Sequence, residues 1–445
     1  MKRPAYQRYK PSGVEWLGDI PEHWETKKLR YLTNIRKGRL PNETFSSPST
    51  ENDLPYLSME FLRNETESPN YVTASPKLVV ASEGDLLLLW DGSNAGEFLI
   101  AKTGVVSSTA AYFEPINIHK RFLFFVCKAL EPQIKDQTIG MGIPHVSGDE
   151  LKSYYLPFPD LVSQQAIASF LDRETERVDR LVVMKRKLIE RLKEKRTALI
   201  SRTVTRGLPP AAGLPENPPL KPSGIDWLGD IPAHWQILKI KRVTISRCDG
   251  PFGSGLKSEH YCNEGVRVIR LQNIRFGKFD NTDTAFIDPD YYKELGDHTV
   301  LPGDVLIAGL GDENHPVGRA CVAPETLGPA MVKADCFRFR LASKHVKPAF
   351  VALQLSTIAN ALAGALSTGT TRGRMNLSST ETRELALPPL TEQAAIISFL
   401  NTETAKLDTL TTEVEQAIER LQEYRIALIT TAVTGKIDVR KESHA

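Results

Sequence analysis

Apolar residues near the C-terminus recur at alternating spacings of three and four, the pattern of a helix with one packed face. The positions are Leu407, Leu410, Val414, Ala417, Leu421, Tyr424 and Leu428. A sequence offset of 229 transfers the pattern to Val178, Leu181, Lys185, Leu188, Leu192, Lys195 and Leu199. We therefore predict two long helices, over residues 161–206 and 391–435, that pair through Leu181, Leu188, Leu192, Leu199, Leu410, Val414, Leu421 and Leu428.

Two positions on the first helical face are lysines, which would be costly in a dry core. The stems of Lys185 and Lys195 can lie along the interface while their ammonium groups reach carboxylates of the other helix. Candidate partners are Glu413, Glu415, Glu419 and Glu423. The charges agree with pairing, since residues 172–206 hold 12 Lys/Arg against 6 Asp/Glu and residues 401–440 hold 5 against 7. A polar helix over residues 164–202 would span roughly 58 Å, and the obvious partner is the other copy.

The chain repeats itself at the ends of two halves. Residues 10–24 (KPSGVEWLGDIPEHW) and 221–235 (KPSGIDWLGDIPAHW) share 12 of 15 positions at an offset of 211. Residues 164–172 and 393–401 match at an offset of 229, as do 196–200 and 425–429. The stretch between the repeats is therefore longer in the second half, by the difference between the two offsets. A retained scaffold with two diverged inserts explains this better than a plain duplication with drift, which would spread the differences evenly.

The two inserts have a mixed α/β pattern. Short apolar runs follow Gly84-Asp85 and Gly303-Asp304, and this parallel placement predicts one fold in both inserts. Helical periodicity is present at 120–130 and 348–363. The expected fold class is thus two tandem α/β (α+β) modules separated by two long helices, with a pseudo-twofold internal repeat. The expected segments are 1–24 (duplicated), 25–160 (first module), 161–206 (helix), 207–220 (Pro-rich linker), 221–235 (duplicated), 236–390 (second module), 391–435 (helix) and 436–445 (tail).

Composition narrows the class of protein. At 445 residues, 41% hydrophobic and 25% charged, the chain suits two ordinary globular domains. It has no run of about 18 apolar residues for a membrane span, and the basic N-terminus lacks the apolar stretch of a secretory signal. Five scattered cysteines favour neither disulfides nor a zinc site. We expect a cytoplasmic protein without a metal; the net charge of +2 says nothing for nucleic acid.

Loops rich in Gly, Ser, Asn and Arg are the candidates for DNA contact. Arginine can make two hydrogen bonds with a guanine edge, Asn and Gln can do so with adenine, and glycine amides approach phosphates closely. Most glycine-rich loops are only turns, so each residue is a candidate and no more. Arg372 and Arg374 stand out because their sequence neighbours are Thr and Gly, with no acidic residue nearby. The candidates are Arg36, Lys37, Arg39, Ser93, Asn94, His145, Ser254, Lys257, Arg270, Gln272, Asn273, Arg275, Thr370, Arg372 and Arg374.

Motifs for catalysis are missing. Asn217-Pro218-Pro219 approaches the motif of adenine methyltransferases, but Leu220 replaces the aromatic residue and no strand precedes it. The chain lacks a G-x-x-x-x-G-K-[ST] phosphate loop, a complete dinucleotide fingerprint and an H-E-x-x-H helix. His23 and His234 recur beside tryptophans inside the duplicated segment, which favours a scaffold role. We predict no catalytic residues and a non-enzymatic chain.

The duplicated K-P-S-G-[VI]-[ED]-W-L-G-D-I-P-x-H-W segments, the module endings LPFP (156–159) and LPPL (387–390), and the helix starts QQAI (164–167) and QAAI (393–396) resemble the specificity subunit of type I restriction–modification systems. The loop 249–257 and residues 271–273 are similar to segments of that family's recognition domains, while the first module is less typical. The resemblance covers nearly the whole chain.

This resemblance implies two target recognition domains that each bind half of a bipartite, asymmetric site on double-stranded DNA. It also implies that the long helices pack antiparallel, set the spacer, and dock two methyltransferase (modification) subunits, which restriction subunits can join. S-adenosylmethionine, ATP and Mg²⁺ would then be bound by partner subunits and no cofactor by this chain. Two alternatives stay open: a specificity subunit of another bifunctional restriction–methylation system, and a coiled-coil scaffold that does not bind DNA.

Overall fold

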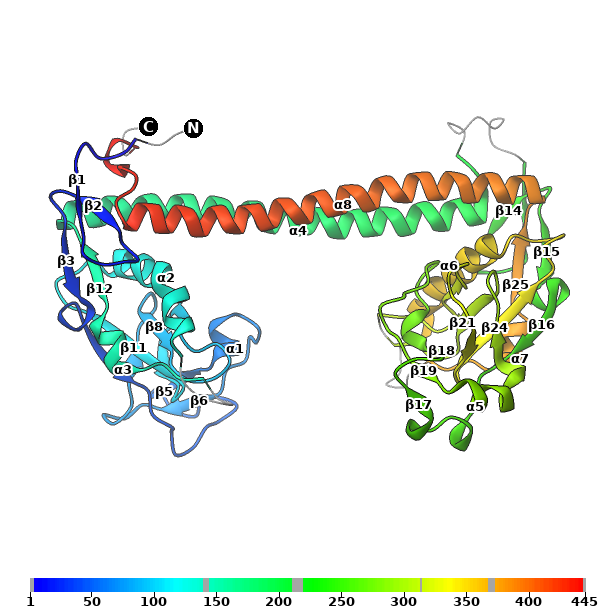
Figure 1. Cartoon of the computed structure of the whole chain (residues 1–445), viewed down its shortest axis with the longest axis horizontal. Helices are drawn as coiled ribbons and strands as arrows, with labels where there is room; N and C mark the ends of the chain where they lie inside the picture. The colour runs from blue at the N-terminus through cyan, green and yellow to red at the C-terminus, as the bar shows by residue number, and fades with distance from the viewer. Residues whose placement is uncertain (1–3, 139–143, 210–218, 313, 367–372, 443–445) are drawn as a thin grey trace. The chain divides into compact units, whose positions relative to one another are not determined.

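The computed structural model describes residues 4–138, 144–209, 219–312, 314–366 and 373–442. The chain forms two compact units: unit 1 is Met1–Arg186 with Glu415–Ala445, and unit 2 is Lys187–Val414. Both boundaries fall inside the long helices α4 (Leu161–Arg206) and α8 (Leu390–Val433), so each unit contains part of both helices (Figure 1). Among the described residues, no helix is long and apolar enough to cross a membrane.

Unit 1 is built on an antiparallel sheet in the order β4-β11-β8-β9. Its strands are β4 (Thr33–Lys37), β11 (Ala110–Pro115), β8 (Leu86–Leu89) and β9 (Phe98–Ile100). Strand β8 is buried on both faces: Leu86 and Leu88 join the core beneath helix α2 (Lys120–Asp136), whereas Leu87 and Leu89 join a second core. This alternation follows from the two-residue period of a strand. The second core lies against β6 (Tyr71–Thr73), β5 (Asp53–Leu57), β10 (Gly104–Val106) and β7 (Val80–Ala81), which form a second sheet in that order.

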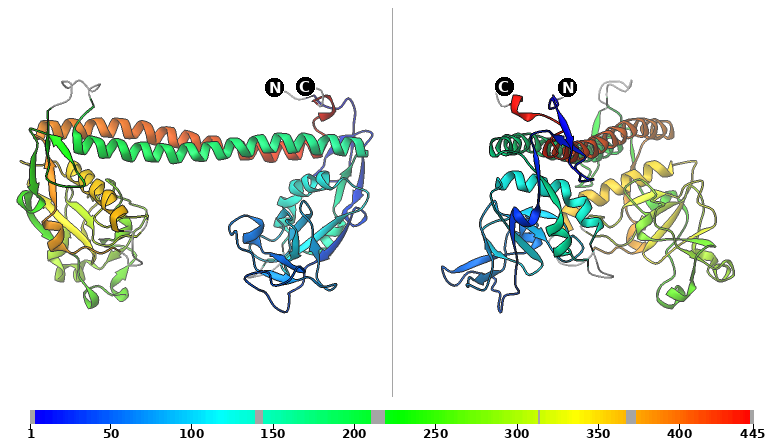
Figure 2. Two further views of the ribbon diagram at one scale, coloured as in Figure 1. Left: turned by 180° about the vertical axis from the view of Figure 1, so that it is seen from behind. Right: turned by 60° about the vertical axis from the view of Figure 1, so that its left-hand side comes forward.

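Unit 2 repeats the first sheet with the order β16-β24-β21-β22. Its strands are β16 (Thr244–Cys248), β24 (Cys336–Leu341), β21 (Val305–Ala308) and β22 (Ala320–Val322), and helix α6 (Pro348–Leu366) contacts β21 and β22 (Figure 2). Val305 and Ile307 face one core while Leu306 and Ala308 face another. The prediction of one fold in both modules, made from the two Gly-Asp starts, is confirmed. The second sheet has five strands here: β17 (Tyr261–Cys262), β19 (Phe286–Ile287), β18 (Val266–Ile269), β23 (Ala330–Val332) and β20 (Thr299–Val300).

The duplicated segments form two equivalent hairpins, and the strand that follows each of them closes its module. The pairs are β1 (Tyr9–Pro11) with β2 (Asp19–Pro21), β3 (Glu25–Lys28) with β12 (Tyr155–Phe158), β13 (Leu220–Pro222) with β14 (Asp230–Pro232), and β15 (Gln236–Lys239) with β25 (Glu384–Leu387). Trp24 and Trp235 are fully buried. Trp24 shares a core with Val433 at the end of α8, and Trp235 shares one with Val204 at the end of α4. The motif therefore packs on a helix end in both units.

The remaining elements are short helices. They are η1 (Leu29–Tyr31), α1 (Met59–Leu62), α3 (Gly148–Ser153), η3 (Ile240–Val243), η4 (Gly253–Gly255), η5 (Ser258–His260), η6 (Leu271–Asn273), α5 (Pro289–Glu294), η7 (Gly296–His298), α7 (Leu377–Glu381) and η8 (Val439–Glu442). Residues 210–218 of the Pro-rich linker lie outside the described part of the chain. Asn217 and Pro218 of the Asn-Pro-Pro sequence are among them.

The buried face of the long helices agrees with the predicted one at Val178, Leu192, Val414 and Leu428 and differs from it at other positions. In unit 1, Val178, Val182 and Leu428 are buried. In unit 2, the buried positions include Ile189, Leu192 and Val414. Three of the predicted pairing residues, Leu181, Leu188 and Leu410, are instead 40–41% exposed. The prediction placed every second contact of α4 one position too early, because the apolar stripe is wider than a single row and spacing alone does not choose between its edges.

The two lysines of the predicted interface, Lys185 and Lys195, do not form the ion pairs that were predicted for them within the described residues. Lys185 is half-buried and Lys195 is exposed, and within the described residues neither forms an ion pair. Charged pairs between the helices join other residues: Asp179 with Arg425 in unit 1, and Arg196 with Asp408 in unit 2. Each of these arginines directly follows a residue that spacing had placed at the interface, a tyrosine in α8 and a lysine in α4.

Candidate nucleic-acid interface

In unit 1, three loops that the sequence singled out meet at one place. Gly92 N donates to Pro144 O at 2.9 Å, and Val146 N donates to Trp90 O at 2.9 Å. These two bonds, which we call the clamp, hold the segment before α3 against the turn after β8. The end of β4 joins them, since Lys37 Nζ lies 2.7 Å from Asp91 Oδ2. His145, between the two backbone bonds, is exposed.

Unit 2 contains the same clamp. Gly311 N donates to Gly373 O at 3.1 Å, and Met375 N donates to Gly309 O at 2.8 Å. The clamp holds the segment before α7 onto the turn after β21, and Arg374 occupies the position that His145 has in unit 1. The clamp and the two backbone segments that it joins, which we call the frame, are thus the same in both units. The exposed side chain that the frame presents differs.

A glycine completes each frame at the end of the first sheet strand. A Cβ on Gly38 would lie 2.1 Å from Ser107 O, and one on Gly250 would lie 2.1 Å from the carbonyl carbon of Lys333. No other residue fits so close to a neighbouring backbone. The glycines therefore keep the loop of the first sheet strand against the turn that precedes β11 or β24.

The unit 1 candidates lie around this frame, mostly engaged with neighbours. Arg36 lies over the ring of Tyr112 and 3.8 Å from Glu114. Asn94 Nδ2 lies 3.2 Å from Oγ of the exposed Ser93. Arg39 is exposed, and within the described residues it has no hydrogen bond or ion pair. The three loops that contain Lys37 and Arg39, Asn94, and His145 are thus joined at the clamp.

Several unit 2 candidates lie on a neighbouring segment, η6 and its flanks. Arg270 pairs with Asp283, and Arg275 Nε lies 3.2 Å from Asp280 Oδ2. Gln272 is exposed. Lys257 is exposed and lies 3.6 Å from Glu259. Ser254 belongs to η4, while Thr370 and Arg372 lie outside the described residues.

Asn273 is wrong as a surface contact. Its side chain is fully buried, accepts from Arg270 N at 2.8 Å, and donates to Asp280 O and Asp283 O at 2.9 and 2.8 Å. All of its hydrogen bonds serve the loop between β18 and β19. The sequence alone does not distinguish a polar loop residue that the fold buries from one that is exposed and able to contact a base.

Arg374 differs from its prediction in its surroundings. The sequence places no acid beside it, but the fold brings Asp335, whose Oδ1 lies 3.1 Å from Arg374 Nη2. Asp335 precedes β24 and is 39 residues away in the chain. Each described candidate arginine of unit 2 is thus paired with an aspartate, which orients the side chain and lowers its attraction for phosphate.

Three residues that shape the candidate interface of unit 2 were not among the residues predicted from the sequence: Asp335, Asp249 and Arg319. Asp249 Oδ1 accepts from Asp335 N at 3.0 Å and from Gly250 N at 2.7 Å. Burial raises the pKa of Asp249 to about 6, and the nearby Asp335 carboxylate adds to this effect. Only the position of Asp249 beside Gly250 could have indicated its role, because its other partner, Asp335, is distant in sequence.

Arg319 is a buried cation that ties the turn after β21 to η6. Its Nε donates to Ile274 O at 2.7 Å, Nη1 to Leu310 O at 2.9 Å, and Nη2 to Leu271 O at 2.9 Å. Burial lowers the pKa of this guanidinium. Its carbonyl partners make it a structural link between the clamp and the segment that carries Arg270 and Gln272.

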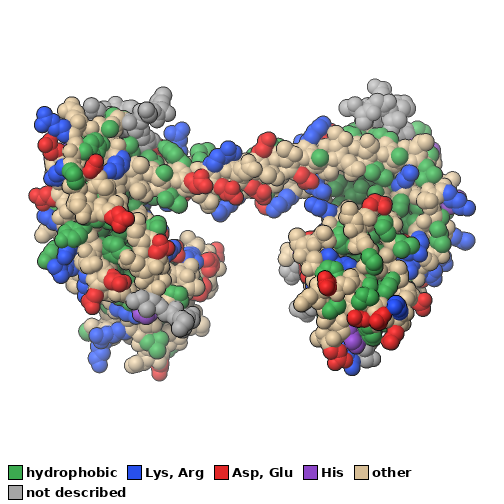
Figure 3. All heavy atoms as spheres, in the orientation of Figure 1, with side chains coloured by type: hydrophobic (Ala, Val, Ile, Leu, Met, Phe, Trp, Pro, Cys, Tyr) green, Lys and Arg blue, Asp and Glu red, His purple; other side chains and the backbone are tan. Residues whose placement is uncertain are grey.

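Surface charge is mixed around these frames. Lysine, arginine, aspartate and glutamate side chains are interspersed over the face of each unit that Figure 3 shows. This agrees with the net charge of +2. Recognition by such a surface depends on a few placed side chains more than on a general electrostatic field.

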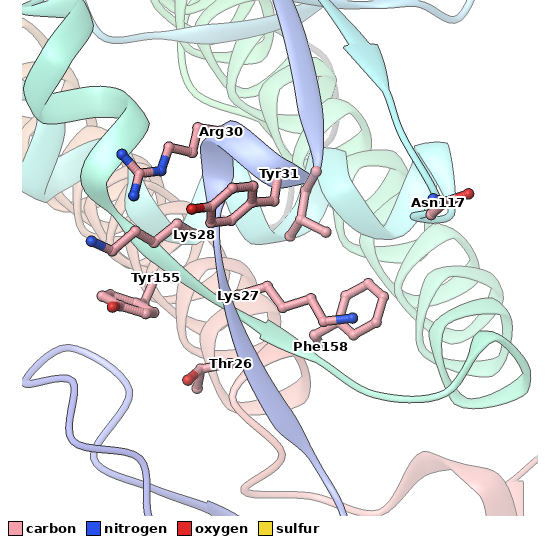
Figure 4. Close-up of a pocket in the computed structure, with 9 residues that line it drawn as sticks. Thr26, Lys27, Lys28, Arg30, Tyr31, Asn117, Tyr155 and Phe158 are labelled. Atoms are coloured by element: carbon pink, nitrogen blue, oxygen red, sulfur yellow. The ribbon is translucent and has the colours of Figure 1, made fainter.

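Unit 1 also has a pocket that residues of β3 and β12 line and that contains no residue of the clamp. Its volume is about 550 Å³, and its lining includes Lys27, Lys28, Tyr155 and Phe158 (Figure 4). Lys27 Nζ lies 3.8 Å from the centroid of the Phe158 ring, and Lys28 Nζ lies 5.1 Å from that of Tyr155. In unit 2 the strand register puts Glu384 and Leu387 where these aromatics stand, so the pocket is not part of the shared frame.

Buried glutamines join each module to its long helix. Gln164 accepts from His119 N and donates to Pro159 O, both at 2.8 Å. Gln393 accepts from Lys347 N and donates to Pro388 O at the same distances. Both are at most 1% exposed. The repeated helix start is therefore a fixed joint between the helix and the base of α2 or α6.

A family model and two related proteins all place this chain among type I restriction specificity subunits. A family model described as the type I restriction modification DNA specificity domain matches residues 21–193 and 281–420, more than half of the chain. The chain is 28% identical over 428 residues to the type I restriction enzyme MjaVIII specificity subunit of Methanocaldococcus jannaschii, covering 95% of this chain and 94% of that protein. It is 27% identical over 211 residues to the EcoKI specificity subunit of Escherichia coli strain K12, covering 47% and 44%.

Solved structures agree on the fold. A chain from work on complex assembly and conformational transition of the type I R-M system matches with a TM-score of 0.66 and 16% identity, covering 94% of this chain and 99% of that one. The HsdS subunit from Thermoanaerobacter tengcongensis matches with a TM-score of 0.50 and 16% identity, covering 94% and 98%. At this identity the likeness concerns the fold.

Proposed function

The chain belongs to the family of type I restriction–modification specificity subunits, as its duplicated motifs predicted, and we propose that each of its units binds one half of a bipartite, asymmetric DNA site. The observation that carries this proposal is the repeated clamp. The same two backbone hydrogen bonds present His145 in unit 1 and Arg374 in unit 2. A shared frame with different side chains suits two readers of one kind that select different bases.

The long helices are proposed to set the spacing between the half-sites. Support comes from the fixed joints at their starts, where Gln164 and Gln393 are bonded identically to their modules. A rigid joint transmits any change in helix length to the module, whereas a flexible joint would absorb it. Helices of 46 and 44 residues span roughly 66–69 Å, which corresponds to about two turns of DNA at about 34 Å each.

Catalysis is proposed to lie in partner subunits. Two methyltransferase subunits would bind S-adenosylmethionine, and restriction subunits, where present, would bind ATP and Mg²⁺. Exposed apolar side chains on the helical parts of unit 1 support a docking role: Met184 is 64% exposed and Ile426 is 60% exposed. Apolar side chains left open on a helix are typical of surfaces that partners cover.

Selection from a random double-stranded DNA library tests the proposal, with the full chain alone and with a co-purified methyltransferase. We expect two short, unlike sequence blocks at a fixed gap. Inserting four residues into α4 and α8 should change the gap and leave both blocks unchanged. Selection of no gapped motif would contradict the DNA-reading role and favour a scaffold; a change in the blocks themselves would contradict the spacing role of the helices.

A further inference from the structure

Arg374 is held along one edge of its guanidinium group. Nε and Nη2 donate to the same oxygen of Asp335, at 3.2 and 3.1 Å. The side chain nevertheless remains 61% exposed. A guanidinium has five N–H donors in one plane, so a carboxylate on the Nε edge leaves the outer edge, formed by Nη1 and Nη2, for a ligand.

Asp335 is fixed on both sides of its own backbone. It has a φ of 63°, in the left-handed region that non-glycine residues rarely adopt. Its amide donates to Asp249 Oδ1 at 3.0 Å, and its carbonyl accepts from Gly309 N at 2.7 Å. The carboxylate itself is 15% exposed. Asp335 thus offers Arg374 a rigid acceptor attached to the same turn that the clamp uses.

We propose that Arg374 reads a guanine in the major groove through its outer edge, and that Asp335 is the residue that positions it. The inference rests on the proposed function of unit 2. Guanine presents two acceptors, O6 and N7, that match two parallel N–H donors. A guanidinium oriented in advance loses less side-chain entropy on binding, and its partner carboxylate repels phosphates, so the pair favours base discrimination over general affinity for DNA.

Unit 1 provides an internal contrast. In unit 1, Thr109 occupies the position that Asp335 has in unit 2. The Thr109 carbonyl accepts from Trp90 N at 2.7 Å, just as the Asp335 carbonyl accepts from Gly309 N. Threonine has no carboxylate to hold a neighbour, and His145 replaces Arg374. The Asp-Arg device therefore belongs to unit 2, and its loss should alter one half-site only.

The test uses the full chain, alone and with co-purified methyltransferase, and the gapped site that it selects. The variants are Arg374→Gln, Arg374→Lys and Asp335→Asn; asparagine tolerates the left-handed backbone. Arg247→Gln is the matched control, because Arg247 also pairs with a carboxylate of unit 2, that of Glu381. Each protein is measured on the site, on single-base changes of it, and on a site in which 7-deazaguanine removes the N7 acceptor.

We expect the wild type to lose roughly 10-fold in affinity when one guanine of the second half-site is replaced or loses N7. Arg374→Gln should abolish that penalty, and Arg374→Lys should reduce it. Asp335→Asn should also reduce it, while affinity for random DNA stays equal or rises; a folding defect would lower both. Arg247→Gln should keep the wild-type profile at every position.

Two failures are distinguishable. If the wild type selects no gapped site, the proposed function fails and the inference with it. If it selects a gapped site, but Arg374→Gln keeps the wild-type base preference at every position, the proposed function stands and the reading role of Arg374 is overturned. If Arg374→Gln changes the preference while Asp335→Asn keeps it, the positioning role of Asp335 is overturned.

Discussion

Asp179 of α4 accepts a hydrogen bond from Arg425 of α8, with 2.9 Å between Oδ1 and Nε. Unit 2 contains the counterpart pair, Arg196 with Asp408, at 3.2 Å. The sequence offset of the helical repeat relates Asp179 to Asp408 and Arg196 to Arg425, so the two pairs exchange roles under the repeat. Each unit therefore contains one aspartate and one arginine that face each other across an antiparallel pair of helix segments.

Charge reversal should measure this pairing in unit 1. Arg425→Glu places two carboxylates together and should lower the melting temperature of the isolated chain, while the added change Asp179→Arg should restore most of the loss. The pair is partly exposed, so removing it by Arg425→Ala should cost only about 0.5–1 kcal/mol. Thermal unfolding checks both values, and additive losses in the double variant would contradict the contact.

Adjacent residues of α4 distinguish the observed helical interface from the one that spacing predicted. Ile189 is 8% exposed and Leu188 is 41% exposed. In the isolated chain, Ile189→Ala should lower the free energy of unfolding by about 2–4 kcal/mol, because it opens a cavity in the interface. Leu188→Ala should cost less than about 1 kcal/mol. Denaturant unfolding of the two variants makes the comparison, and the reverse order would support the predicted interface instead.

Asn273 should act on stability and not on base choice. Asn273→Ala leaves Arg270 N and Asp280 O without their side-chain partner, which should cost about 2–4 kcal/mol; Asp283 O keeps its hydrogen bond from Arg267. Gln272→Ala, one position earlier and exposed, should leave stability unchanged. Unfolding experiments on both variants provide the measurement. If the Asn273→Ala protein is as stable as the wild type and its base preference is altered, Asn273 contributes to DNA recognition after all.

The raised pKa of Asp249 gives unit 2 a pH dependence with a definite sign. Burial raises this pKa from 3.8 to about 6, so between those values the unfolded chain has released a proton that the folded chain retains. The contribution of Asp249 to stability therefore falls as pH rises from about 4 to about 6 and stays low above that.

Asp249→Asn removes the ionisation but keeps an oxygen for the amides of Gly250 and Asp335. We expect it to raise the melting temperature by about 2–4 °C at pH 7.5 and to leave it unchanged near pH 4. Thermal unfolding across this range is the measurement. An equal effect at both pH values would mean that the hydrogen bonds, and not the charge, decide the stability of this loop.

The recognition frame shows why some of the site was within reach of the sequence and some was not. The loops around Arg36, Asn94 and Arg374 were predicted because glycines and polar residues interrupt the apolar runs there. The sequence did not show which loops meet within each unit, since the backbone bonds of the clamp join Gly92 to Pro144 in unit 1 and Gly311 to Gly373 in unit 2, and these residues are far apart in the chain. Asp335 entered the site for the same reason.

The sequence by itself determined the repeat, the two α/β modules and the two long helices, because short-range periodicity and direct identity are visible along one chain. It also indicated the family, because the duplicated motif is a contiguous stretch of residues that can be read along the chain. In the structure, the tryptophans of that motif, Trp24 and Trp235, pack on the helix ends. The tertiary structure decided which edge of the helical stripe is buried, that Asn273 points inward, and that Arg374 meets Asp335. Those outcomes depend on contacts between residues distant in the chain, which no local pattern encodes.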